Sequence, residues 1–92
     1  MNELEKKGQM VARAIAFATK AHEGQFRKGT KRPYIVHPLE VGEIVATLTF
    51  DEEIISAALL HDTIEDCQGI TREVLAREFS ERVAALVAQE SE

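Results

Sequence analysis

The chain has 92 residues, of which 45% are hydrophobic and 29% are charged, a composition typical of a soluble globular domain and not of a disordered segment. This length fits one domain or part of one, and such a chain buries only roughly 60 to 65% of its unfolded surface. The formal net charge of −5 argues against a general nucleic-acid binder. The single cysteine, Cys67, excludes an internal disulfide and a zinc knuckle. Without a signal-peptide core or a membrane-spanning run, the cytoplasm is the expected compartment.

The first predicted helix runs from about Leu4 to Ala21. Its apolar positions follow the spacing i, i+3, i+4, i+7 of an amphipathic helix: Val11, Ala14, Ile15 and Ala18. Gly24 is expected to take the left-handed conformation that closes such a helix.

A loop is predicted for residues 22–36, where two glycines and a proline interrupt the helical pattern. Four of its side chains are cationic: Arg27, Lys28, Lys31 and Arg32. A solvated charge run is the usual meaning of such a stretch. Because the protein is acidic overall and these charges immediately precede His37 and Pro38, a site for an anionic ligand is the alternative interpretation.

The second predicted helix covers residues 38–49, with Pro38 in the first turn, where its missing N–H is not needed. Its apolar stripe consists of Val41, Ile44, Val45 and Leu48. His37 lies at the start of this helix. A single histidine there is more often a cap or a packed side chain than a ligand, so His37 matters only together with His61 and Asp62.

The third predicted helix covers about residues 52–64, with Asp51 as its N-cap. An almost unbroken apolar run ends here in four polar side chains: His61, Asp62, Glu65 and Asp66. In a helix, their spacings of three and four residues put them on one stripe. Acids near a helix C-terminus are unfavourable unless a cation neutralises them, so a metal ion is one explanation. A hydrated helix end in solvent is the other.

Two further helices are expected, one capped by Thr71 and running through Phe79, the other capped by Ser80. No alternating strand pattern of useful length follows or precedes them. The predicted fold is therefore all-α, with about five helices in a single domain.

Three segments together resemble the HD-domain phosphohydrolases: GQFRKGTKRPYIVHP, ALLHDTIED and REFSERVAALV. Within that superfamily the similarity is to the RelA/SpoT-type alarmone hydrolases and their small single-domain relatives, from about Ala14 to Val87. The resemblance implies an all-α HD helical bundle. It also implies manganese-dependent removal of pyrophosphate from the 3′ position of guanosine tetra- or pentaphosphate.

The resemblance further implies roles for seven residues. The metal ligands would be His37, His61 and Asp62, holding Mn²⁺ or another divalent cation such as zinc. The pair that handles the attacking water would be Glu65 and Asp66. The basic pair beside the nucleotide would be Arg27 and Lys28, through guanine stacking or phosphate pairing.

The sequence departs from the family pattern at its end. The family requires a later metal-binding aspartate, and no aspartate follows Asp66; Glu90 and Glu92 do not match its position. Residues 1–92 are therefore expected to form an incomplete HD domain, whose uncovered apolar helix faces favour a homo-oligomer. Two alternatives stay open: an incomplete HD module that binds nucleotide or protein without turnover, and another phosphomonoesterase or nucleotidase of the superfamily.

Three other side chains receive structural interpretations. His22 is expected at a helix end, tied to the loop backbone, and Tyr34 is expected to pack the loop down. Cys67 has no partner cysteine, so its place beside the acidic cluster is interpreted as incidental.

Overall fold

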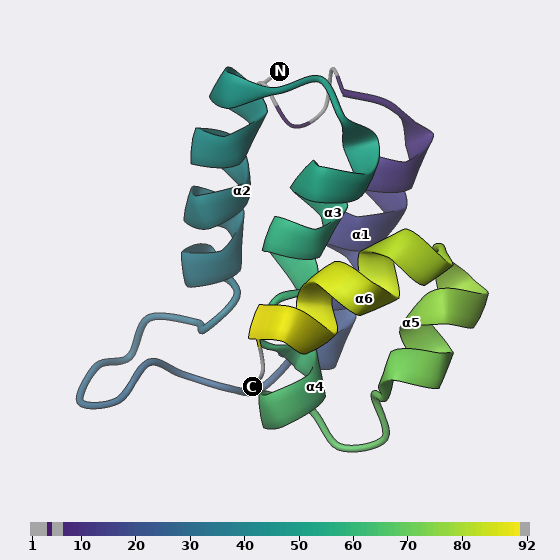
Figure 1. Ribbon diagram of the computed structural model, residues 1–92. Coiled ribbons are helices and arrows are strands. Elements are labelled where there is room, and N and C mark those ends of the chain that lie inside the picture. The colour runs from purple at the N-terminus through teal and green to yellow at the C-terminus, as the bar shows by residue number, and fades with distance from the viewer. Residues whose placement is uncertain (1–3, 5–6, 91–92) are drawn as a thin grey trace.

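The computed structural model describes Leu4 and residues 7–90, the side chain of Glu90 excepted. The part of the chain that the structure describes contains six helices: α1 (Gln9–Ala21), α2 (Val36–Leu48), α3 (Glu52–Leu60), α4 (Thr63–Asp66), α5 (Arg72–Glu78) and α6 (Glu81–Glu90). Helix α3 is central and packs against α1, α2 and α6, while α5 packs against α6 (Figure 1). Within the described residues, the only strand-like pairing is an isolated bridge between Phe26 and Pro33. The predicted all-α fold is confirmed.

Helix ends follow local side-chain chemistry. Each of three predicted N-caps is confirmed, because its side-chain oxygen accepts a backbone N–H from the first turn: Asp51 for α3, Thr71 for α5 and Ser80 for α6. Gly24 has the expected positive φ, 83°, shortly after α1.

Each helix of the described chain is too short or too polar to cross a lipid bilayer.

Two predicted helix starts are wrong. Helix α1 begins at Gln9 and not near Leu4, because Gly8 adopts φ 121° just before it; residues 5 and 6 lie outside the described residues. Glu52 of α3 accepts the backbone N–H of Met10 at 3.2 Å, which satisfies one of the free donors at this start. Helix α2 begins two residues earlier than expected, so His37 lies in its first turn.

The predicted third helix is divided in two. Helix α3 ends at Leu60, and two backbone carbonyls that a continuous helix would use there accept hydrogen bonds from side chains. The Ala58 carbonyl lies 2.6 Å from Nδ1 of His61, and the Leu60 carbonyl accepts the hydroxyl of Thr63 at 2.8 Å. Such local bonds compete with helical ones. The chain therefore turns at residues 61–62 before α4 begins.

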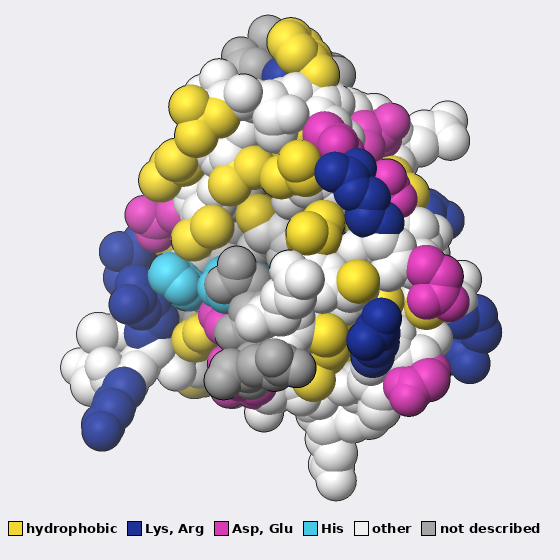
Figure 2. All heavy atoms as spheres, in the orientation of Figure 1, with side chains coloured by type: hydrophobic (Ala, Val, Ile, Leu, Met, Phe, Trp, Pro, Cys, Tyr) yellow, Lys and Arg dark blue, Asp and Glu magenta, His cyan; other side chains and the backbone are white. Residues whose placement is uncertain are grey.

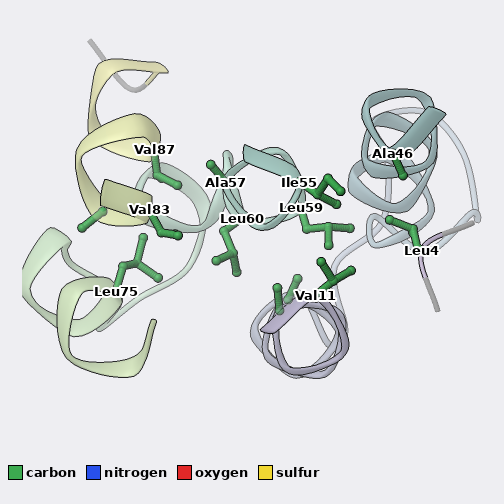
Figure 3. Packing of buried hydrophobic residues seen from close by; sticks show 13 residues of the cluster. Leu4, Val11, Ala46, Ile55, Ala57, Leu59, Leu60, Leu75, Val83 and Val87 are labelled. Atoms are coloured by element: carbon green, nitrogen blue, oxygen red, sulfur yellow. The ribbon is translucent and has the colours of Figure 1, made fainter. Parts of the chain in front are cut away.

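The hydrophobic core surrounds α3 (Figure 3). Ile55, Leu59 and Leu60 of this helix are completely buried. Gly42 lets α2 approach closely, because a Cβ atom at this position would lie 2.5 Å from Cδ2 of Leu59. This contact sets the distance between α2 and α3, on which the position of His37 depends.

A polar network joins the starts of α3 and α6 outside the core. Arg82 Nη1 lies 2.7 Å from Asp51 Oδ2 and 3.2 Å from Glu53 Oε1, and the Ser80 hydroxyl donates to Glu53 Oε2 at 2.6 Å. The hydrogen bond from Arg82 lowers the pKa of Asp51. The hydrogen bonds from Ser80 and then Arg82 lower the pKa of Glu53. Both carboxylates therefore help to hold α6 against α3 when they are ionised.

Candidate metal centre

Packing of α2 on α3 brings together three of the predicted site residues. The ligand atoms of His37, His61 and Asp62 all lie within 4.8 Å of one another. Asp62 Oδ2 is 3.1 Å from His61 Nε2 and 4.0 Å from His37 Nε2, and the two histidine rings are 5.6 Å apart between centroids. All three side chains are half-buried. A path therefore exists from solvent to the cluster.

The hydrogen bond of His61 determines which ring nitrogen is free. Nδ1 lies 2.6 Å from the Ala58 carbonyl, which can only accept, so Nδ1 carries a proton. In a neutral His61 the Nε2 lone pair then faces Asp62 Oδ2, another acceptor, at 3.1 Å. Two acceptors at this distance repel each other unless a cation lies between them, either a proton on Nε2 or a metal ion. An Nδ1 proton bound to a backbone carbonyl is also the usual arrangement behind a histidine metal ligand.

The donor set fits a divalent transition metal. Two imidazole nitrogens and one carboxylate oxygen suit ions such as Mn²⁺, Fe²⁺ or Zn²⁺. Three protein ligands leave coordination positions for water or substrate. The two acids compared above with the family's later aspartate cannot be placed, because the side chain of Glu90 and the whole of Glu92 lie outside the described part of the chain.

Tyr34 contacts this cluster, which the sequence interpretation did not anticipate. Its hydroxyl donates to Asp62 Oδ2 at 2.5 Å, and its ring lies 6.0 Å from that of His37. Burial, followed by the hydrogen bond to Asp62, raises the pKa of the phenol above its usual range. The phenol therefore remains a donor. The sequence offered only a general indication of this contact: the hydroxyl of a tyrosine that packs against the protein usually needs a hydrogen-bond partner.

His22 packs against the Tyr34 ring, and Cys67 contacts His22. His22 follows α1 directly, as predicted, and its ring lies 4.9 Å from that of Tyr34. Its Nδ1 is 2.9 Å from Gln25 Oε1 and 3.5 Å from the Cys67 sulfur. The Cys67 thiol is buried, which raises its pKa and favours the unreactive protonated form. The His22 ring, held by Gln25 and Cys67, therefore packs against the ring of Tyr34.

The predicted acidic pair lies on α4, next to the cluster. Glu65 and Asp66 are both exposed. The predicted single stripe is wrong, because α3 ends before these residues; instead the backbone N–H of Asp66 donates to the Asp62 carbonyl at 2.9 Å. The Asp66 carboxylate also contributes to the raised pKa of Tyr34, so its charge acts on the same side of the cluster.

The basic loop forms a projecting hairpin, residues 26–33. The Arg27 N–H donates to the Arg32 carbonyl at 3.0 Å, and Gly29 at the tip has φ 77°. Arg27 and Lys28 are exposed, and dark blue side chains border the cyan histidines on this face (Figure 2). The hairpin therefore presents positive charge near the cluster, although the described residues place neither side chain in contact with it.

An apolar groove of about 470 Å³ opens beside His37 and His61. It lies between α2, α3 and α6 and is lined mainly by aliphatic side chains: Val41, Val45, Ile54, Ala57, Ala58 and Leu86. Apolar side chains continue from it across this face of the molecule (Figure 2). On the outer side of α2, Leu48 is 80% exposed and Ile44 is 63% exposed.

A family model described as an HD domain matches residues 14–92. The chain belongs to the HD-domain family. His61 and Asp62 form the HD dipeptide within the ALLHDTIED segment, and they are two of the three clustered residues of this HD-domain chain.

The HD-domain chain is similar to parts of longer proteins, some named as pyrophosphohydrolases and others as pyrophosphokinases. A guanosine-3′,5′-bis(diphosphate) 3′-pyrophosphohydrolase of Aquifex aeolicus is 51% identical over 77 residues, which are 84% of this chain and 11% of that protein. One of the same name from Haemophilus influenzae is 51% identical over 70 residues, covering 76% and 10%. A GTP pyrophosphokinase of Myxococcus xanthus is 46% identical over 78 residues, covering 85% and 10%. The chain thus spans about a tenth of the length of the curated relatives it matches.

Proposed function

We propose that the chain carries the metal centre of a phosphohydrolase that removes pyrophosphate from the 3′ position of guanosine tetra- or pentaphosphate. The observation that carries this proposal is the convergence of His37, His61 and Asp62 within 4.8 Å, with the Nε2 lone pair of His61 facing the cluster. Membership of the HD-domain family and the names of the pyrophosphohydrolase relatives support it.

The proposed ion is Mn²⁺, which accepts mixed nitrogen and oxygen ligands together with open positions for water. When bound, a divalent ion lowers the pKa of a water molecule and polarises a phosphoryl oxygen. His37 and His61 would hold it through neutral nitrogens and Asp62 through a charged oxygen.

The exposed acids of α4 and the hairpin cations have separate proposed roles. Glu65 or Asp66 would orient the attacking water and accept its proton, a contribution of typically about 10² to 10⁴ in rate. Arg27 and Lys28 would offset the charge that develops on the phosphates. Exposure leaves all four side chains free to reach a bound nucleotide.

The test is pyrophosphate release from guanosine tetraphosphate by the purified chain, with and without Mn²⁺. We expect Mn²⁺-dependent release, lowered at least about 100-fold by the double variant Glu65→Gln/Asp66→Asn, which removes both candidate bases. Glu81→Gln, which changes an exposed acid in the first turn of α6, is the matched control and should retain the wild-type rate. Mn²⁺ binding without any release would contradict hydrolysis. It would favour the second candidate, nucleotide or protein binding without turnover.

We also propose that copies of the chain form a homo-oligomer through the apolar face of α2 and the adjoining groove. Leu48, Ile44 and Ile54 are 80%, 63% and 36% exposed, and apolar patches of this kind drive association. Light scattering is expected to give the mass of a dimer or a higher oligomer. The double variant Ile44→Lys/Leu48→Lys should be a monomer, because it places two like charges in the contact. A wild-type monomer at high protein concentration would contradict this proposal.

A further inference from the structure

The backbone around Tyr34 fixes this residue between the hairpin and α2. Its N–H donates to the Gln25 carbonyl at 2.8 Å, and its own carbonyl accepts the N–H of His37 at 3.0 Å. Tyr34 is therefore held on one side by the base of the hairpin and on the other by the first turn of α2.

The side chain of Tyr34 contacts two of the three clustered residues, which come from different elements. Its ring packs between His22, at 4.9 Å, and His37, at 6.0 Å between centroids. Its hydroxyl reaches Asp62 Oδ2 at 2.5 Å. The contacts tie the start of α2 to the turn between α3 and α4.

The oxygen that Tyr34 binds is the one that faces both histidines. Asp62 Oδ2 is 3.1 Å from His61 Nε2 and 4.0 Å from His37 Nε2. A carboxylate turns easily about its last torsion, and each of its oxygens has two acceptor positions. One donor on Oδ2 restrains this rotation and leaves the second position of the same oxygen for a cation. Without the hydroxyl, a half-buried carboxylate would turn toward water.

We propose that Tyr34 is a positioning residue of the metal centre, whose hydroxyl holds Asp62 and whose ring holds His37 in the orientation that receives the ion. This inference rests on the proposed metal site. Partners of metal ligands commonly contribute about 10-fold to 100-fold to metal affinity, because they orient the ligand before the ion arrives.

The test is Mn²⁺ affinity, measured by electron paramagnetic resonance of the free ion in titrations of the chain. Tyr34→Phe keeps the ring between its two histidine neighbours and removes only the hydroxyl. We expect its Kd for Mn²⁺ to rise about tenfold, while the thermal unfolding of the metal-free protein changes little. Tyr34→Leu, which also removes the ring, should weaken binding further.

Ser80→Ala is the matched control. It removes another hydroxyl that donates to a carboxylate at a similar distance, 2.6 Å to Glu53, at the other end of α3. This variant should lose stability, since Ser80 also caps α6, and should keep the wild-type Kd.

The outcomes separate the inference from the function on which it rests. Wild-type binding together with an unchanged or tighter Tyr34→Phe Kd would overturn the role of Tyr34 and leave the metal site standing. Equal weakening in Tyr34→Phe and Ser80→Ala would show a general structural effect and would also overturn it. Failure of the wild-type chain to bind Mn²⁺ would remove the metal site itself, and the positioning role with it.

Discussion

Asp62→Asn is expected to abolish tight divalent-metal binding, with an increase in Kd of more than about 100-fold, beyond the range seen when a partner of a ligand is removed. Asparagine has nearly the same shape, and its carbonyl oxygen still accepts the Tyr34 hydroxyl. What is lost is the negative charge that faces His61 Nε2 at 3.1 Å and His37 Nε2 at 4.0 Å. Calorimetric titration with Mn²⁺ measures the change.

Asp51→Asn is the control for this prediction. It makes the same substitution at the N-cap of α3, where asparagine caps about as well as aspartate, so the fold should be retained. Mn²⁺ affinity should equal that of the wild type. If Asp62→Asn bound Mn²⁺ within about threefold of Asp51→Asn, the assignment of Asp62 as a ligand would be wrong, since a charged oxygen ligand contributes far more.

The second large effect is expected at Gly42, which lies away from the cluster. Gly42→Ala would place a Cβ atom 2.5 Å from Cδ2 and 2.9 Å from Cγ of Leu59, a side chain that is completely buried. Overpacking of this kind costs about 1–3 kcal/mol of unfolding free energy. Urea unfolding followed by circular dichroism measures this loss. Mn²⁺ affinity should fall as well. The added methyl group would push α2 away from α3, and His37, which lies in the first turn of α2, would move with it.

A double-mutant cycle shows whether the two side chains really collide. Leu59→Ala alone should cost about 2–5 kcal/mol through the cavity it leaves. In the double variant Gly42→Ala/Leu59→Ala the atoms that would clash are gone, so its loss should be smaller than the sum of the single losses by about 1 kcal/mol or more. Strict additivity would contradict the close approach of α2 and α3 at this point.

Local chemistry made much of this fold predictable. The caps at Asp51, Thr71 and Ser80 depend on a side chain and the backbone two or three residues later, which sequence displays directly. The all-α class followed from helical periodicity. The association of His37 with His61 required the family resemblance, because no local rule joins positions 24 residues apart in the sequence.

Three features were not predicted from the sequence: one arises from competing local hydrogen bonds, and two depend on contacts between distant parts of the chain. The division between α3 and α4 arises because the ring of His61 and the hydroxyl of Thr63 take up backbone carbonyls. The bond from Tyr34 to Asp62 joins residues 28 apart. The function of Gly42 is set by the side chain of Leu59 on another helix.

The central position of α3 has a further consequence for how proteins of this architecture can diverge. Three helices enclose α3, and the turn that follows it carries His61 and Asp62, so a change that shifts α3 also shifts two of the three clustered residues. The hairpin of residues 26–33 instead closes on its own bridge and turn bonds, outside that enclosure. Substitutions in the hairpin can therefore change the positive charge beside the cluster without disturbing the packing around α3. The charge on this face and the packing that holds the cluster can therefore vary independently of each other.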